Sequence, residues 1–228
     1  MSSRMQPNAD MDAVHGPAPI VVVGAGGHGR EVLDVIEACN TVEETWLFLG
    51  FIDDGDPARD RLERRRAEYL GGLDILSNRH GTYVIGIGDG PTRQRIDACA
   101  TAVGLKPARL VHPQASIGSD VLFGPGTVVT AGVRVTTNIR IGRHVHLNLN
   151  STITHDCVLE DYVTVNPGAN ISGNVVLHEG VTVGTGAAVI QGITIGAHAT
   201  VGAGAVVVNN VEPGTTVVGV PAKPLVRR

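Results

Sequence analysis

A histidine followed directly by an aspartate, His155 and Asp156, stands in a stretch of small and apolar residues between Ser151 and Asp161. Imidazole exchanges protons near neutral pH, and a carboxylate bonded to its far ring nitrogen fixes the tautomer and stabilises the imidazolium. The pair therefore suits a general base. Cys157 falls at a small apolar position of the pattern, so we expect a buried thiol rather than a nucleophile. The alternative for His155 is a turn residue without chemistry.

A second set of residues near the N-terminus suits phosphate binding. Gly24, Gly26 and Gly29 have the spacing G-x-G-x-x-G between a predicted strand, residues 20–23, and a predicted helix. Such glycines let backbone N–H groups and a helix N-terminus approach a phosphate. The spacing alone does not establish NAD binding. His28 is either a polar turn residue or a donor to a pyrophosphate.

Acidic residues and glycine end the next two predicted strands. Asp53 and Asp54 close "WLFLGFIDD", and Gly88 and Asp89 close "YVIGIGDG". Ligands of open α/β sheets bind at the carboxyl ends of the strands. Only about 90 residues lie between Pro19 and the next part of the chain, enough for one βαβαβ half of a dinucleotide fold but not for two. We therefore expect a nucleotide that carries something shorter.

The second part of the chain repeats every six residues. Every sixth residue from Val111 to Val207 is apolar, and a small or apolar residue follows most of these anchors after four positions. This period is typical of a parallel β-helix, in which stacked coils bury a core that no single unit can bury. With three units per coil, residues three hexads apart should stack, and the register should hold to Glu212. Small anchors fit the low aromatic content of one Trp, three Tyr and three Phe.

The sequence thus predicts α/β plus all-β architecture. We expect a disordered leader at residues 1–18, a small Rossmann-like domain at 19–108, and a β-helix with a C-terminal tail at 109–228. Leu122, Val128, Val158 and Val176 precede anchors and should point outward, leaving apolar surface that packing of three prisms would cover. No long loop interrupts the repeat to close a pocket, so a site would need a neighbouring subunit.

Charge and cysteine content exclude several classes of protein. A formal net charge of -4 without a basic stripe argues against nucleic acid as a partner. Three widely spaced cysteines suggest neither disulfides nor a zinc knuckle and favour a reducing cytoplasm. No run approaches the roughly 18 apolar residues of a membrane span, so no membrane association is expected.

Taken together, the motifs resemble the hexapeptide-repeat acyltransferases of the sialic acid O-acetyltransferase and nucleotide-4-amino-sugar N-acetyltransferase family. The resemblance covers about residues 19 to 225 and rests on "VGAGGHGREVLDVIE", "FIDD", "IGDGPTR", "HPQASIG", "THDCVLEDYVTVNPGANISGNV", "GTGAAVIQGITIG" and "VGAGAVVVNNVEPGTTVVGVPAK". It implies a homotrimer with sites between subunits, a left-handed β-helix, acetyl-CoA as co-substrate and no metal. The implied reaction is direct N-acetylation of a nucleotide-linked amino-deoxysugar, at a 4-amino group, with O-acetylation of a sugar hydroxyl as the alternative.

The same resemblance implies roles for individual residues. His155 would be the general base, with Asp156 orienting it. Residues that match the sugar-nucleotide motifs are Gly26, Gly27, His28, Asp53, Asp54, Gly88, Asp89 and Arg93. Residues at the positions that contact acetyl-CoA are Gly173, Thr185, Ala203, Gly204 and Lys223.

One position departs from the family pattern. Many relatives carry a second histidine nine residues after the first, close to the acyl donor, and this chain has Thr164 there. His146 should stack directly beneath Thr164 in the β-helix. His146 is therefore one candidate to supply an imidazole near acetyl-CoA from one coil away, and loss of that donor contact at Thr164 is the alternative.

Three other classes of protein remain as alternatives. A hydratase similar to the γ-class carbonic anhydrases would need three converging histidines for zinc, and the close histidine pair of that family is absent. An NAD-dependent oxidoreductase would explain the glycine turn but not the repeat. A non-catalytic binding or assembly protein built on the β-helix is the third.

Overall fold

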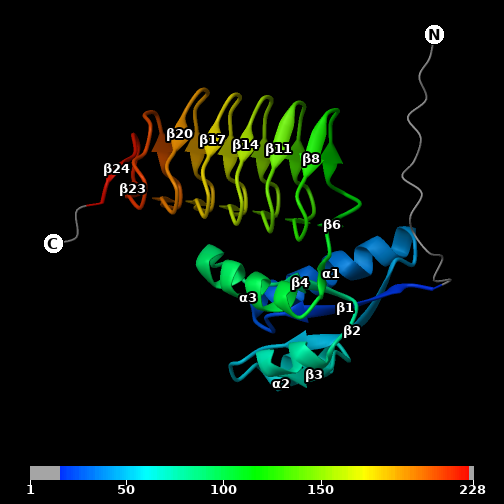
Figure 1. Ribbon diagram of the computed structural model, residues 1–228. Helices are drawn as coiled ribbons and strands as arrows, with labels where there is room; N and C mark the ends of the chain where they lie inside the picture. The colour runs from blue at the N-terminus through cyan, green and yellow to red at the C-terminus, as the bar shows by residue number, and fades with distance from the viewer. Residues whose placement is uncertain (1–15, 226–228) are drawn as a thin grey trace, which may run out of the picture.

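The computed structural model describes residues 16–225 and divides into an α/β domain followed by a β-helix (Figure 1). The predicted leader lies outside the described residues except at its end, where strand β1 (Ala18–Val23) already begins. The last three residues of the predicted C-terminal tail, 226–228, also lie outside them. The fold class expected from the sequence is confirmed.

The α/β domain contains a five-stranded parallel sheet in the order β3-β2-β1-β4-β5. Strand order changes direction between β1 and β4, which makes their carboxyl ends the switch point of the sheet. The elements that follow β1 are α1 (Gly27–Val42), β2 (Trp46–Ile52), α2 (Arg59–Arg64), β3 (Tyr69–Gly71), a 3-10 helix (Leu73–Asn78), β4 (Thr82–Ile85), α3 (Gly90–Ala102) and β5 (Lys106–Pro107).

Strand β1 is apolar on both sides because both faces of the sheet are covered. Ile20 and Val22 pack in a cluster with α1, whereas Val21 and Val23 pack with α3 and the 3-10 helix. The unbroken run of β-branched residues in β1 is therefore what a central parallel strand requires. Figure 1 shows α1 and α3 next to the β-helix, with α2 and β3 at the far end of the domain.

The β-helix has three parallel faces. The first contains β6 (Leu110–Val111), β9 (Val128–Val129), β12 (His146–Leu147), β15 (Thr164–Val165), β18 (Thr182–Val183), β21 (Thr200–Val201), β23 (Thr216–Val218) and the antiparallel β24 (Lys223–Pro224). The second contains β7 (Ser116–Ile117), β10 (Arg134–Val135), β13 (Thr152–Ile153), β16 (Asn170–Ile171), β19 (Ala188–Val189) and β22 (Val206–Val207). The third contains β8 (Val121–Phe123), β11 (Ile139–Ile141), β14 (Val158–Leu159), β17 (Val176–Leu177) and β20 (Thr194–Ile195).

Residues three hexads apart stack, as the repeat predicts. Arg134 pairs with Thr152, and Thr152 pairs with Asn170. The anchors from Val129 to Val207 are buried, and Cys157 lies inside the prism with them. The prediction that the register holds to Glu212 is wrong in the last coil. Ile195 pairs with Val211, so this coil is two residues shorter than the others.

The α/β domain sits on the first face of the β-helix. Leu110 and Val128 complete the hydrophobic cluster of α1, so the two units share one core at this contact. The expectation that Val128 is exposed is therefore wrong, while Leu122 is 59% and Val158 38% exposed. Within residues 16–225, no helix is both long and apolar enough to cross a membrane.

Candidate active site

The histidine–aspartate pair lies in the turn between β13 and β14, at the edge shared by the second and third faces. His155 Nδ1 is 2.7 Å from Asp156 Oδ2, and both side chains are about half exposed, at 49% and 50%. Asp156 has a positive φ of 62°, a conformation that this position repeats in Asn138 and Asn174 of the adjacent coils. The turn thus points both side chains outward without disturbing the hexads.

Gly173, one coil above, leaves room for the imidazole of His155. A Cβ at Gly173 would collide with the ring of His155. One coil below, Asn138 Nδ2 donates to Asp156 Oδ1 over 3.1 Å. The hydrogen bonds from His155 and Asn138 lower the pKa of Asp156. The carboxylate therefore stays ionised and acts as an acceptor that orients the ring through Nδ1, which leaves Nε2 to face a substrate.

The glycine turn forms one wall of a crevice at the switch point of the α/β sheet. A Cβ at Gly29 would collide with the carbonyl of Gly24, and one at Gly86 would collide with Gly29. These glycines let the turn after β1 and the loop after β4 touch. Helix α1 begins at Gly27 behind Gly26, and no side chain from residues 16–225 caps it. Its first N–H groups are free for a phosphate.

The predicted acidic residues organise this crevice. Asp53 Oδ2 accepts from the N–H of Ala25 over 2.7 Å, which ties the end of β2 to the glycine turn. Asp54 Oδ1 accepts from the N–H of Leu73 over 2.7 Å. Asp89 caps α3 by accepting from the N–H of Thr92, and this bond lowers the pKa of Asp89.

A pocket of about 180 Å³ opens among these strand ends. Asp53, Asp54, Thr92 and Arg95 contribute its polar lining. Arg95 was not singled out from the sequence, although it stands in the "GDGPTRQR" segment, two residues after the arginine that was. On a helix, residues two apart point in different directions, and only the structure shows which arginine faces the pocket.

Arg93, predicted to contact the substrate, is instead buried between the two domains with 0% exposure. Its Nη1 donates to the carbonyl of Gly88 over 2.8 Å, and its Nη2 donates to the carbonyl of Tyr162 over 2.6 Å and to Thr164 Oγ1 over 2.9 Å. Burial lowers its pKa to about 10. With its donors taken by the protein, Arg93 joins the domain to the β-helix, which corrects the predicted role.

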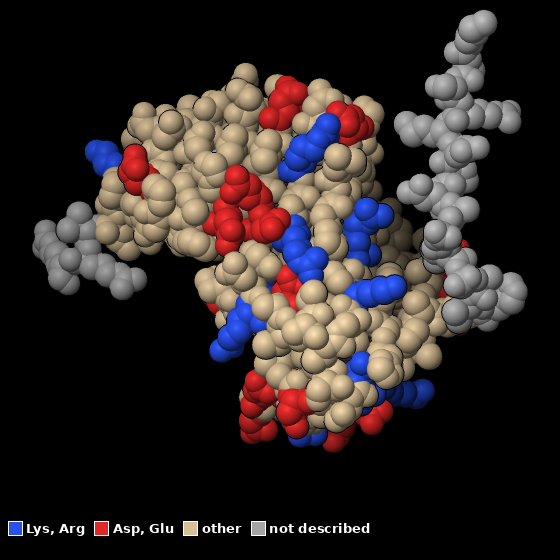
Figure 2. All heavy atoms as spheres, in the orientation of Figure 1, with Lys and Arg blue, Asp and Glu red and all other residues tan. Residues whose placement is uncertain are grey.

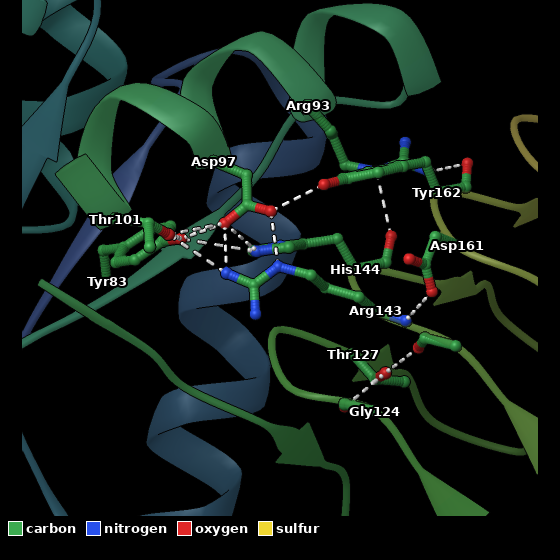
Figure 3. A network of polar contacts seen from close by, with 11 residues as sticks. Tyr83, Arg93, Asp97, Thr101, Gly124, Thr127, Arg143, His144, Asp161 and Tyr162 are labelled. Carbon is green, nitrogen blue, oxygen red and sulfur yellow. Dashed lines mark hydrogen bonds and ion pairs between the residues drawn. The ribbon is translucent and has the colours of Figure 1, made fainter.

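Asp97, one helical turn beyond Arg93, is the centre of a second buried network (Figure 3). It accepts from Arg143, Tyr83 and Tyr162, and His144 Nε2 lies 3.0 Å from its Oδ1. Burial alone would raise the pKa of Asp97, but these hydrogen bonds lower it well below its usual range. One signal of this contact is visible in the sequence, because the four-residue spacing puts Arg93 and Asp97 on one face of α3.

His146 and Thr164, predicted near acetyl-CoA, stack as expected but lie under the α/β domain with 0% and 1% exposure. His146 Nδ1 is 3.0 Å from Nε2 of His28, whose Nδ1 is 3.1 Å from Glu31. Thr164 donates to the carbonyl of Gly88. Their burial corrects the predicted contact with acetyl-CoA, because neither side chain can reach it in this chain.

The other residues predicted for acetyl-CoA do not gather in one chain. Gly173 lies beside His155, whereas Thr185, Ala203 and Gly204 are exposed at the edge between the first and second faces. Lys223 is exposed in β24. Among residues 16–225, no three His, Cys, Asp or Glu side chains group so as to hold a metal ion.

Comparisons with known proteins agree with this architecture. Residues 19–97 match the model of the PglD N-terminal domain. The chain is 31% identical over 152 residues to GDP-perosamine N-acetyltransferase of Escherichia coli O157:H7, a match that covers 63% of this chain and 65% of that enzyme's length. That share is slightly under two thirds of the relative.

Solved structures match over nearly the whole chain. A histidine-to-asparagine variant of perosamine N-acetyltransferase from Caulobacter crescentus, in complex with CoA and GDP-perosamine, superposes with a TM-score of 0.82 at 28% identity and covers 94% of this chain and 99% of its own. The acetyltransferase domain of PglB from Neisseria gonorrhoeae FA1090, in complex with acetyl coenzyme A, gives 0.80 at 32% identity, with 92% and 100% covered. WeeI from Acinetobacter baumannii AYE gives 0.80 at 32%, with 90% and 99% covered. The chain belongs to the hexapeptide-repeat family of nucleotide-amino-sugar N-acetyltransferases.

Proposed function

We propose that this protein transfers the acetyl group of acetyl-CoA to the 4-amino group of a nucleotide-linked amino-deoxysugar. The observation that carries the proposal is the His155 ring, held by Asp156 at 2.7 Å over a glycine on an exposed edge. The CoA, acetyl-CoA and GDP-perosamine found with the solved relatives support the identity of both substrates. The Caulobacter crescentus relative was solved with CoA and GDP-perosamine as two variants, in which asparagine or alanine replaces one histidine.

The reaction follows from the geometry of this pair. His155 Nε2 takes a proton from the sugar amine as the nitrogen attacks the thioester carbonyl. Asp156 keeps the ring oriented and stabilises the imidazolium. The N–H of Gly173 donates no hydrogen bond within the described residues, so it is free to stabilise the developing oxyanion. Collapse of the tetrahedral intermediate breaks the C–S bond, and the CoA thiolate takes the proton from the imidazolium.

The nucleotide sugar would occupy the crevice of the α/β domain. Its diphosphate fits the free N–H groups of Gly26 and Gly27 at the start of α1, with Arg95 as a cation at the pocket. Asp53, Asp54, Gly88 and Asp89 would line the nucleoside side.

A chain cannot deliver this substrate to its own His155. The α/β domain covers the first face of the β-helix, and His155 stands on the edge between the other two faces. We therefore propose a homotrimer in which the crevice of one subunit meets His155 of the next. The third face, turned to the viewer in Figure 2, carries exposed Leu122 and Val158 beside its charged side chains, and these exposed apolar residues support its burial against a neighbour.

The same arrangement would gather the acetyl-CoA site. Gly173 of one prism and Thr185, Ala203 and Gly204 of another can face each other only across an interface, because they stand on different edges of one prism. Lys223 at the last coil is then placed for the phosphates at the nucleotide end of CoA.

An activity panel tests the reaction. Acetyl-CoA is incubated with GDP-, UDP- and dTDP-linked 4-amino sugars and with the corresponding 4-hydroxy sugars, and released thiol is measured. We expect turnover with one amino sugar. Turnover of hydroxy sugars alone would instead indicate O-acetylation, and no turnover or binding of either panel would favour a non-catalytic assembly protein.

Mixed trimers test the placement of the site between subunits. His155→Ala removes the base, and Gly27→Glu puts a carboxylate at the mouth of the phosphate site, where a Cβ meets nothing closer than 4.0 Å. Each variant alone should be inactive. Co-expressed and purified by two tags, they should regain part of the activity, because some interfaces join an intact crevice to an intact His155. No recovery in mixed trimers would contradict a shared site.

A further inference from the structure

One row of side chains on the first face of the β-helix meets both turns that border the nucleotide-sugar crevice. Val128, His146 and Thr164 pair from coil to coil through β9, β12 and β15. Val128 packs into the cluster of α1, His146 contacts His28 in the glycine turn, and Thr164 contacts Gly88 in the loop after β4. The β-helix therefore supports the crevice from below, coil by coil.

His146 is the polar member of this row that lacks a complete set of partners. Its Nδ1 lies 3.0 Å from His28 Nε2, and the two ring centroids are 5.0 Å apart. Its Nε2 is buried and has no partner within residues 16–225. Burial lowers its pKa well below the usual value, and the nearby Arg93, His28 and His144 add to this. His146 is therefore neutral and carries one ring proton.

The hydrogen-bond network assigns the position of that proton. The carboxylate of Glu31 only accepts, so His28 must present Nδ1–H to it. When His28 carries a single ring proton, that proton is therefore on Nδ1, its Nε2 has a lone pair, and His146 donates to it from Nδ1. This leaves His146 Nε2 as a bare acceptor. The opposite assignment would bury an unpaired N–H, which costs about 1–3 kcal/mol.

We propose that His146 is a positioning residue that fixes His28 as an Nδ1–H donor toward the diphosphate of the nucleotide sugar. This rests on the proposed function, which puts that diphosphate at the glycine turn. Glu31, whose side chain is 55% exposed, accepts from the His28 donor and is free to rotate away when a phosphate takes its place. His146 touches no substrate and acts only through His28.

Steady-state kinetics separate positioning from folding. His146→Val installs the residue that Val128 already provides in the same row, and His146→Asn keeps an N–H donor. In His146→Val, His28 is no longer fixed as a donor to the charged diphosphate. Loss of that hydrogen bond should raise KM for the nucleotide sugar about tenfold, while kcat and KM for acetyl-CoA should not change. His146→Asn should recover most of the affinity. Thr182→Val, two coils above His146 in the same row and half-buried, is the matched control and should behave as the unchanged protein.

The 15N spectrum of histidine-labelled protein reports the tautomer without any substrate. We expect His28, identified by its loss in His28→Gln, to be protonated at Nδ1 in the unchanged protein and mixed in His146→Val. A His28 protonated at Nε2, or an unaltered KM for the sugar in folded His146→Val, would overturn the proposal. Failure of the unchanged protein to acetylate any nucleotide sugar would refute the proposed function instead, while the tautomer measurement would still decide the role of His146 toward His28.

Discussion

The edge at His155 and the contact at Asp97 place similar side chains in opposite settings. His155 and Asp156 are half exposed and bond almost only to each other, whereas His144 and Asp97 are 0% and 5% exposed at the side chain, and Arg143, Tyr83 and Tyr162 also donate to Asp97. The presence of a histidine next to a carboxylate therefore does not by itself make a functional site. The His155–Asp156 pair is exposed to solvent and has glycine above the ring, so a substrate can approach it. The His144–Asp97 pair is enclosed between the two domains and holds them together.

The sharpest way to separate the two pairs is to remove the exposed imidazole. His155→Ala should lower kcat by about 10²–10⁴-fold, the usual contribution of a general base. Its half-exposed side chain contributes little to the core, so Tm and the proposed trimer should not change. Rates with saturating substrates and a melting curve test this. Retained turnover would remove His155 as the base and leave the edge without a chemical role.

The orienting carboxylate comes next in expected effect. Asp156→Asn should fit the fold, because Asn138 and Asn174 hold the same turn position with φ values of 57° and 55°. It keeps the shape but presents no charge to the imidazolium, so kcat should fall at least about tenfold. Asn138→Gly serves as a control, because glycine adopts the same positive φ and the change removes only the hydrogen bond from Asn138 to Asp156. Equal rates for Asp156→Asn and the unchanged protein would mean that the carboxylate does not orient the base.

Substitution in the enclosed His144–Asp97 pair should lower the free energy of unfolding rather than the reaction rate. Asp97→Asn leaves Arg143 and His144 without their charged partner, and breaking such a buried pair costs about 3 kcal/mol. Asp120→Asn is the matched control, because its ion pair with Arg140 is about half exposed and is worth under about 1 kcal/mol. Denaturant unfolding of both variants measures the difference. Equal losses would show that the domain contact is not held by Asp97.

The smallest effect is on the pH dependence of stability. The folded-state pKa values of His144, His146 and Asp97 are all lowered, so the unfolded chain binds more protons than the folded chain on acidification. Stability should therefore fall as pH drops below about 6.5, through the histidines, and again below about 4, through Asp97. Melting curves from pH 8 to about 2.5 cover both steps. The first step should shrink in His146→Val, and a Tm that rises on acidification would contradict the assignment.

Much of the β-helix was predictable because its signal repeats. The hexad anchors, the stacking of His146 under Thr164 and the outward turn at His155 all follow from a period that each coil imposes on the next. The prediction failed where the repeat ends, at Val211, since no coil continues beyond it to hold the register. It also failed at Val128, where an element from another domain covers an otherwise ordinary outward position.

The sequence by itself determined the two architectures, the glycine turn and the presence of an imidazole–carboxylate pair on a prism edge, because these depend on neighbours along the chain or in the adjacent coil. Only the tertiary structure decided which face the α/β domain covers. That contact buries Arg93, His146 and Thr164 and turns the crevice, with Arg95 in its lining, away from the chain's own His155. The contact consists of hydrogen bonds and apolar contacts between residues far apart in the chain. Unlike the hexapeptide repeat, these contacts leave no periodic pattern in a single sequence.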